Sequence, residues 1–360
     1  VEPRLKDIGR FIDGGTAAFP NTIILAANYR EEDGLIEDDE SVRWSFATTG
    51  PGGTTVLRIP EKRLLAPIID GQHRLFGFNF ISRPKRLDMP LVCAVFFDLP
   101  KPYQAKLFAT INANQRPVSK SQTYELFGYN VEEEKPEKWT PEKLAVFLTR
   151  KLNTEEHSPF FRHIAIPAEN EISPSLAEAR RAGEWSVSTA TVVEGIVRLI
   201  SGNPKMDSYA MAGEKRYEGL DRTVLQPATA PEKTPLRSLY LAKQDDLIYS
   251  AVTNYFVAVQ AALWVSAPAA SYIRKTVGVQ ALFDLARPLF FQATDEKDLR
   301  AARFQVIMAK ASSVNFADTF FQASGTGRLR IRACLAYCFG LLKPEDLKPT
   351  DLEHVRRLCE

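Results

Sequence analysis

The sequence is poor in the features that mark disulfide-rich, metal-rich and membrane proteins. Its 360 residues include four cysteines and four histidines, and its most apolar stretch, 255–270, is interrupted by polar residues and a proline. Four scattered cysteines are too few for a disulfide framework, which indicates a reducing compartment. No signal peptide is recognisable. We therefore expect a cytoplasmic protein that makes no contact with a membrane.

Net charge is also nearly absent. The chain has 46 Lys and Arg residues against 44 Asp and Glu residues, so the whole molecule has little attraction for nucleic acid. Any contact with DNA must come from a local basic face. A composition of 45% hydrophobic and 25% charged residues is typical of a folded protein, and 360 residues suffice for two domains.

Two of the cysteines, Cys334 and Cys338, lie four residues apart and would share one face of a helix. Two ligands do not complete a zinc site, and no further His or Cys follows close by in the sequence. A two-ligand metal site is thus the weaker interpretation. We expect both residues to be small members of a buried core.

The first 129 residues alternate predicted strands with predicted helices, which is typical of an α+β domain with a mixed sheet. The apolar run at 91–99 indicates a strand in the middle of its sheet. The other expected strands are 22–25, 42–46, 54–59 and 64–69, and the expected helices are 4–13, 75–80, 102–111 and 119–127.

Beyond residue 130 the pattern changes to that of a mainly helical domain, 130–360. A charged linker is expected at 130–140, and the polar segment 201–236, rich in Gly and Pro, is expected to be an exposed loop. Apolar periodicity predicts helices at 140–152, 187–200, 247–265, 277–291, 299–311 and 328–341.

The junction between the predicted strand and helix at residues 70–74 has the composition of a phosphate site. Unpaired backbone N–H groups at a helix start attract anions, and Gly71 allows a ligand to approach the backbone. Arg74 can fork onto phosphate oxygens, and His73 can donate or shuttle a proton. Asp70 would bind hydrated Mg²⁺, orient His73 or accept a hydrogen bond from a ribose. The structural alternative is an Asp-Gly turn that caps a helix, with Arg74 paired to a neighbouring carboxylate.

This junction also carries a family resemblance. Residues 68–77, IIDGQHRLFG, resemble the signature of the DGQHR-domain family, which includes DndB-type regulators of DNA phosphorothioation and DpdB-type proteins of deazaguanine DNA-modification clusters. Residues 107–119, LFATINANQRPVS, resemble the segment after the family's next strand and helix, and residues 19–24 resemble its early strand. The resemblance covers about residues 4–128. It implies a ParB/sulfiredoxin-like domain that binds nucleotide phosphate.

The wider superfamily suggests roles for single residues. Residues 71–74 are similar to the Gly-x-x-Arg box of ParB, and Gln72 stands where sulfiredoxin has its reactive cysteine, which excludes that redox chemistry. Residues 112–116 resemble the Glu-Asn-x-x-Arg box of ParB, with spacing one residue longer. Ile111 replaces the glutamate that helps to hold Mg²⁺, a departure that affects hydrolysis more than binding.

The ligand implied by this resemblance is ATP or another nucleoside triphosphate with Mg²⁺, held between Arg74 and Arg116. Asp70 and His73 are the candidate catalytic residues, and Asp70 and Asn112 are the candidate Mg²⁺ ligands. The candidate phosphate-binding residues are Gly71, Gln72, Arg74, Asn112, Asn114, Gln115, Arg116, Ser119 and Lys120.

A second candidate site is a run of arginines, Arg328, Arg330 and Arg332, after the small residues of 324–327. The run lacks the Lys-Ser/Thr ending of a P-loop, so nucleotide binding there is not indicated. Amides at a helix start followed by arginines could hold a DNA phosphate. The alternative is a flexible loop with a solvated basic face.

Together these patterns predict a nucleotide-binding accessory or regulatory protein of a bacterial DNA-modification or defence system. Its expected partners are DNA and other DNA-modification proteins, and Mg-dependent ATP hydrolysis is an open second activity. The alternative is a non-enzymatic DNA-binding repressor of the modification operon. A nuclease is a weaker third interpretation, because Asp70 is the one carboxylate in the motif. The oligomeric state, including a homo-oligomer, stays open.

Overall fold

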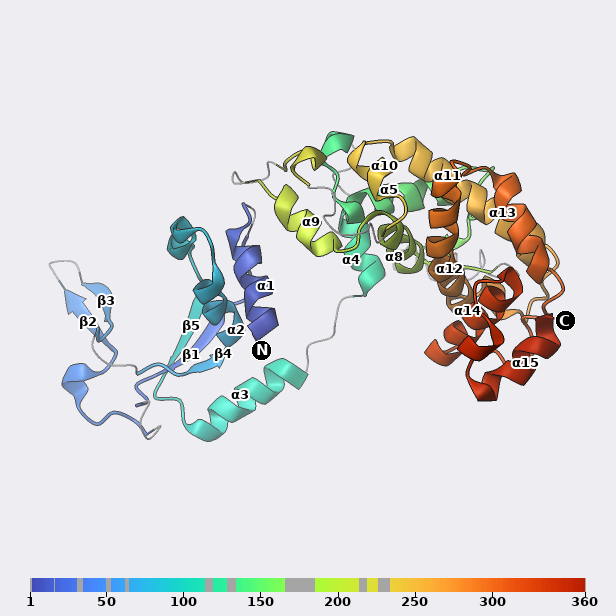
Figure 1. Cartoon of the computed structure of the whole chain (residues 1–360). Coiled ribbons are helices and arrows are strands. Elements are labelled where there is room, and N and C mark those ends of the chain that lie inside the picture. Colours follow the sequence, from blue (N-terminus) through green and yellow to red (C-terminus); the bar gives the residue numbers. More distant parts are fainter. Residues whose placement is uncertain are drawn as a thin grey trace. The chain divides into compact units, whose positions relative to one another are not determined.

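The computed structural model describes residues 2–15, 17–30, 35–49, 53–61, 65–113, 119–127, 134–165, 185–213, 219–225 and 234–359. Their contacts divide the chain into two compact units (Figure 1), namely Val1–Pro117 with Ala212–Glu218, and Val118–Met211 with Gly219–Glu360. The first unit combines helices with small sheets and the second is mainly helical, which confirms the α+β class.

The boundary between the units lies twelve residues before the expected one at residue 129. Helix α4 (Lys120–Phe127) packs against α5 (Pro141–Thr154) and α8 (Thr189–Ile200), and so belongs to the second unit. Part of the expected linker belongs there as well. Trp139 is buried in the helical core, and Lys143 pairs with Glu134.

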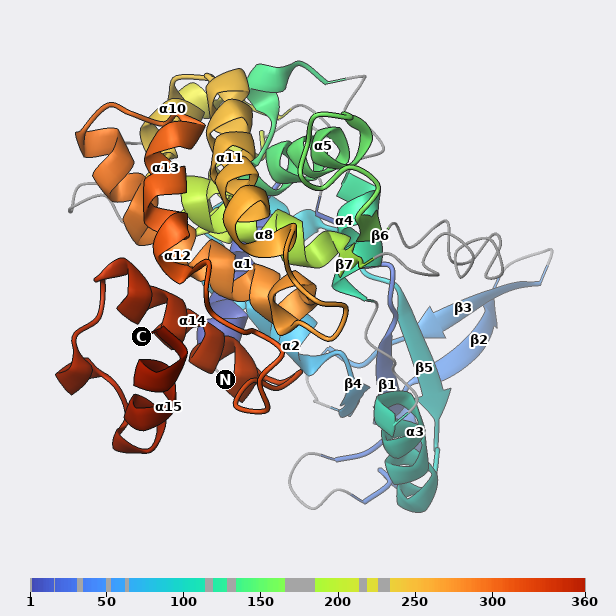
Figure 2. The same ribbon diagram turned by 90° about the vertical axis from the view of Figure 1, so that its right-hand side faces the viewer.

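The main sheet of the first unit has β1 (Ile23–Ala27) between β4 (Ile68–Asp70), which is antiparallel, and β5 (Cys93–Phe97), which is parallel (Figure 2). The expectation that the apolar run at 91–99 is the central strand is therefore wrong for the described sheet. Cys93 and Phe96 on β5 are exposed. An apolar composition indicates burial but does not identify the strand's pairing partners.

Helix α1 (Glu2–Asp13) fixes the segment that follows the junction at residues 70–74. It packs on α2 (Gln72–Phe76) and on the short helix η2 (Gly77–Phe80). A Cβ on Gly77 would lie 2.3 Å from Cγ2 of Ile8, so this close approach requires glycine. Burial would raise the pKa of Asp13, but hydrogen bonds from Ser82 and Arg83 lower it below its ordinary value. The aspartate anchors the chain just beyond η2.

The first unit also contains a β-hairpin, formed by β2 (Ser45–Thr49) and β3 (Thr54–Arg58), and the helix α3 (Lys101–Ala113). Phe46 of the hairpin contacts Phe97 of β5, with 4.9 Å between ring centroids. The strand expected at 42–46 begins later, after a 3-10 turn at Glu40–Val42, and β4 begins at residue 68, four residues later than expected. Helix α3 packs against β4.

The second unit holds most of the hydrophobic core. In it α12 (Thr276–Asp295) packs against α8 and α14 (Gly325–Phe339), and α5 packs against α8 (Figures 1 and 2). Helix α11 (Asp245–Val259) packs against α13 (Ala301–Met308). The helices predicted for this half are confirmed, although residues 187–188 form a strand before α8 starts. The further elements are α9 (Pro204–Met211), α10 (Arg237–Leu241), α11 (Asp245–Val259), α12 (Thr276–Asp295), α13 (Ala301–Met308), α14 (Gly325–Phe339), α15 (Pro349–Cys359) and the pair β6 (Ile164–Ala165) and β7 (Val187–Ser188).

One described stretch, Asp245–Trp264, is long and apolar enough to cross a membrane by length and composition. In its most apolar window 61% is buried inside the second unit, as in a core helix of a soluble protein.

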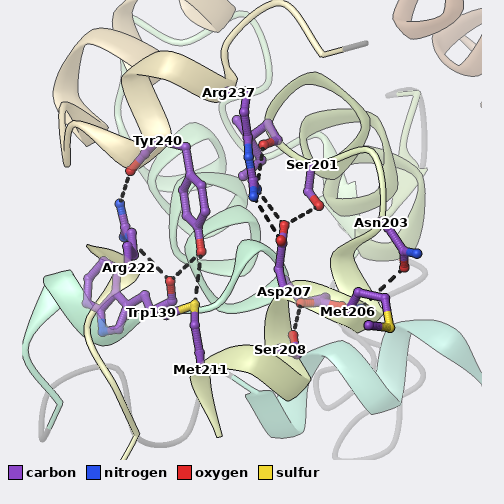
Figure 3. A network of polar contacts seen from close by, with 12 residues as sticks. Trp139, Ser201, Asn203, Met206, Asp207, Ser208, Met211, Arg222, Arg237 and Tyr240 are labelled. Atoms are coloured by element: carbon purple, nitrogen blue, oxygen red, sulfur yellow. Dashed lines mark hydrogen bonds and ion pairs between the residues drawn. The ribbon is translucent and has the colours of Figure 1, made fainter. Parts of the chain in front are cut away.

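The segment 201–236 differs from the exposed loop expected there. It contains α9, and Arg222 within it is completely buried. The Arg222 guanidinium donates to Asp245 at 2.6 and 2.9 Å and to the Pro136 carbonyl. It also donates to the carbonyls of Trp139 and Tyr240 (Figure 3). Because all five of its N–H groups find acceptors, the buried charge is fully compensated.

A second ion pair in the same region joins α9 to α10. Arg237 donates to Asp207, which also accepts a hydrogen bond from Ser201 at 2.6 Å (Figure 3). The hydroxyl of Tyr240 donates to the Trp139 carbonyl at 2.9 Å, and burial raises the pKa of this phenol. This polar network, centred on Arg222 and Arg237, fastens segments distant in sequence into one unit.

We expect Arg222→Ala to lower the free energy of unfolding of the helical unit by about 3–5 kcal/mol, because the change leaves a cavity at a fully buried site and removes both hydrogen bonds from the half-buried Asp245. Urea unfolding followed by circular dichroism measures this. The matched control is Lys243→Ala, which removes a partly exposed pair with Asp221 and should cost less than about 1 kcal/mol. Equal losses in the two variants would contradict the role given to Arg222.

Candidate functional site

The junction between β4 and α2 is a tight turn through a left-handed glycine. Gly71 has φ 98° and ψ 4°, a conformation that favours glycine over residues with a side chain. A Cβ at this position would lie 3.1 Å from Cγ1 of Ile23 and 3.2 Å from Nη2 of Arg74. The backbone angle thus favours glycine here, and the packing leaves little room for a Cβ.

An ion pair spans this turn. Nη2 of Arg74 donates to Oδ2 of Asp70 at 2.8 Å, and Nη1 donates to the Asn21 carbonyl at 2.7 Å. The side chains of Arg74 and Asp70 are 18% and 25% exposed, so solvent reaches the pair. Arg74 is therefore engaged by a neighbouring carboxylate, as the structural alternative predicted.

The backbone at the turn offers further hydrogen-bond donors. Helix α2 is a single short turn with no side-chain cap, and its first backbone bond runs from the Leu75 N–H to the Gly71 carbonyl. Among the residues that the structure describes, the amides of Gln72, His73 and Arg74 have no acceptor. Gln72 is exposed and His73 is half-buried. Asp70, Arg74 and these amides together form what we call the DGQHR turn.

The second part of the predicted nucleotide site is described in part. The backbone of Asn112 lies in the last turn of α3, but its side chain is not among the described parts of the structure. Asn114, Gln115 and Arg116 lie outside the described residues. Helix α3 packs against β4, the strand that ends at Asp70. The pairing of Arg74 with Arg116 around one triphosphate therefore stays a prediction.

Ser119 and Lys120 belong to the second unit. Nζ of Lys120 pairs with Oε1 of Glu194 on α8 at 2.5 Å, and the Ser119 carbonyl accepts the Thr123 N–H. Lys120 thus connects α4 to α8, and the Ser119 carbonyl accepts the first hydrogen bond of α4. Phosphate binding by these two residues stays a prediction.

The arginine run on α14 divides between two surroundings. Arg328 donates to both carboxylate oxygens of Asp284 on α12, at 2.6 and 2.8 Å, and this raises its pKa. Arg330 turns elsewhere, to the Phe320 carbonyl at 3.0 Å and to Asp351 at 3.4 Å. Arg332 is exposed and makes no ion pair within the described ranges. The flexible-loop alternative is wrong for Arg328 and Arg330, which are half-buried and paired.

Arg328 and Arg332 line a cavity of about 700 Å³ within the second unit. Two further arginines complete it, Arg198 on α8 and Arg287 on α12, which the sequence patterns did not single out. A signal was present in the sequence, because each is the one cation of a predominantly apolar helix. Its other lining residues are Ser201, Gly202, Thr234, Phe283, Asp284, Gly325 and Leu329. We call this the arginine pocket.

The cysteines form a cluster that the sequence did not predict. Cys359 on α15 forms a disulfide with Cys338, and its Sγ lies 3.4 Å from Sγ of buried Cys334. The three sulfur atoms lie within 4.8 Å of one another, close enough to share a metal ion if all were free thiols. Burial raises the pKa of the Cys334 thiol to about 12. The expectation of small buried core residues is confirmed for Cys334, whereas Cys338 is half-buried and disulfide-bonded.

No family model, curated protein or solved structure matches this chain. The DGQHR resemblance therefore stays a prediction from residues 68–77 and 107–119 of the sequence.

We expect Gly71→Ala to destabilise the first unit by about 1–3 kcal/mol, since a Cβ at this left-handed position is strained and contacts Ile23. Thermal unfolding of the full chain measures the effect. Gly325→Ala is the matched control, because a Cβ there meets no atom within 4 Å. A wild-type melting profile for Gly71→Ala would contradict the strained turn.

Proposed function

We propose that this protein is a nucleotide-binding accessory or regulatory protein of a bacterial DNA-modification or defence system, and that the DGQHR turn is its ligand site. The observation that carries the proposal is the solvent-accessible ion pair between Asp70 and Arg74 across the left-handed Gly71. The DGQHR resemblance supports the biological setting, and the charges at the turn support the ligand class.

The ion pair suits a ligand that brings both signs of charge. A nucleoside triphosphate with Mg²⁺ offers phosphate oxygens to the guanidinium of Arg74, and Asp70 supplies the hard carboxylate oxygen that Mg²⁺ prefers. When the ligand binds, Arg74 can therefore pair with the phosphate in place of Asp70, and Asp70 can bind Mg²⁺ in place of Arg74. Neither charge is then left unpaired. A phosphate without a metal ion would release Arg74 but leave Asp70 beside an anion.

The backbone adds to this selectivity. The amides of Gln72, His73 and Arg74 supply donors for phosphate oxygens, and glycine at residue 71 leaves no Cβ to obstruct the turn. Bound Mg²⁺ would neutralise part of the phosphate charge. Hydrolysis would further require an oriented water, for which Asp70 and His73 are the candidates.

We expect ATP with Mg²⁺ to bind the full chain in calorimetric titration, and Arg74→Ala to weaken binding by about tenfold or more, because a charge-assisted hydrogen bond to phosphate is lost. Asp70→Asn should retain binding but reduce its dependence on Mg²⁺. Parallel titrations with CTP and GTP identify the preferred base, and phosphate release reports hydrolysis.

The matched control is Arg10→Ala, which removes an exposed arginine–aspartate pair on α1 of the same unit and changes no residue of the motif. It should bind as the wild type does. Undiminished affinity of Arg74→Ala, with its fold verified by circular dichroism, would overturn the proposed site.

A further inference from the structure

The arginine pocket of the helical unit has the composition of a site for a phosphorylated ligand. Four arginines line it against a single carboxylate, Asp284. They come from three helices, with Arg198 on α8, Arg287 on α12, and Arg328 and Arg332 on α14. In a protein whose overall charge is nearly balanced, this excess is local.

The carboxylates around the pocket do not neutralise all of its positive charge. Asp284 is occupied by Arg328 and also accepts from Arg198 at 3.2 Å. Glu194, behind Arg198 at 3.7 Å, is shared with Lys120. Arg332 is left as a guanidinium on the pocket wall with no carboxylate partner among the described residues.

The position of Arg328 is fixed rather than mobile. Its bidentate pair with Asp284 orients the guanidinium plane, and this pair is half-buried. A preoriented arginine loses less side-chain entropy when it binds an anion. Arg328 and Asp284 thus serve as a scaffold, while Arg332 provides the uncompensated charge.

The start of α14 adds donors to the same wall. Ser324 caps the helix by accepting the Gly327 N–H at 3.3 Å, and Gly325, which lines the pocket, has open space where a side chain would be. In the part of the chain that the structure describes, the Gly325 amide has no hydrogen-bond acceptor. This N–H group and the helix dipole favour the same sign of ligand charge as the arginines do.

The shape and the apolar lining narrow the ligand class. A cavity of about 700 Å³ is in the range of small-ligand pockets. Leu329 on its wall is 54% exposed and offers an apolar surface for a sugar or base, and Phe283 also lines the pocket. We infer that the arginine pocket binds the phosphate of a single nucleotide, either free or as part of an unpaired DNA strand.

This inference does not require ligand binding at the DGQHR turn, because all lining residues of the pocket belong to the second unit. The test uses the full chain and two probes, a fluorescently labelled single-stranded DNA oligonucleotide and a free deoxynucleoside monophosphate as competitor. Anisotropy gives the affinity for the strand, and competition gives that for the free nucleotide.

We expect Arg332→Ala to weaken binding by about tenfold and Arg332→Glu to weaken it further, because a phosphate contact is removed and then opposed. The magnitude of the slope of log affinity against log salt concentration should fall by about one, the change expected when one phosphate contact is lost. Arg330→Ala is the matched control on the same helix, since Arg330 faces Phe320 and Asp351 and does not line the pocket.

Two results would overturn the inference: no binding of either probe by the wild type, or equal losses from Arg332→Ala and Arg330→Ala. Displacement of the strand by the free nucleotide would identify a free nucleotide as a ligand. Binding of the strand without competition would instead identify nucleic acid. Arg74→Ala should leave this binding unchanged, which separates the pocket from the proposed function of the DGQHR turn.

Discussion

The ion pair between Asp70 and Arg74 is the interaction on which this account of the protein depends. It spans a turn between strand and helix at a glycine whose φ of 98° favours glycine over residues with a side chain. The same pair keeps two opposite charges together where solvent can reach them. The pair can therefore stabilise the turn and also bind a ligand, because a ligand that carries a negative and a positive group can replace both partners of the pair.

The packing around the turn supports this view. Gly77, six residues after Gly71, lets α1 approach α2 and η2, and Asp13 at the end of α1 fastens the chain beyond them. The motif thus contains one glycine for backbone conformation and one for close packing. Arg74, which lies between the two glycines, is held by its hydrogen bonds to Asp70 and to the Asn21 carbonyl.

Local features could be predicted from the sequence, and features that depend on distant partners could not. The glycine turn after a strand, the Thr140 cap of α5 and the helices of the second half follow from short-range patterns. The burial of Arg222 could not be predicted, because its acceptors come from segments up to 86 residues away. The same reason applies to Cys359, which reaches Cys334 across 25 residues, and to the arginine pocket, whose four arginines come from three helices.

The central claim is that nucleotide binding exchanges the partners of Asp70 and Arg74. A crystal structure of the full chain with Mg²⁺ and a non-hydrolysable ATP analogue tests this most directly. The account predicts phosphate oxygens on the Arg74 guanidinium, the metal ion beside Asp70, and the bond between the two side chains broken. An intact pair with the analogue bound elsewhere would contradict it.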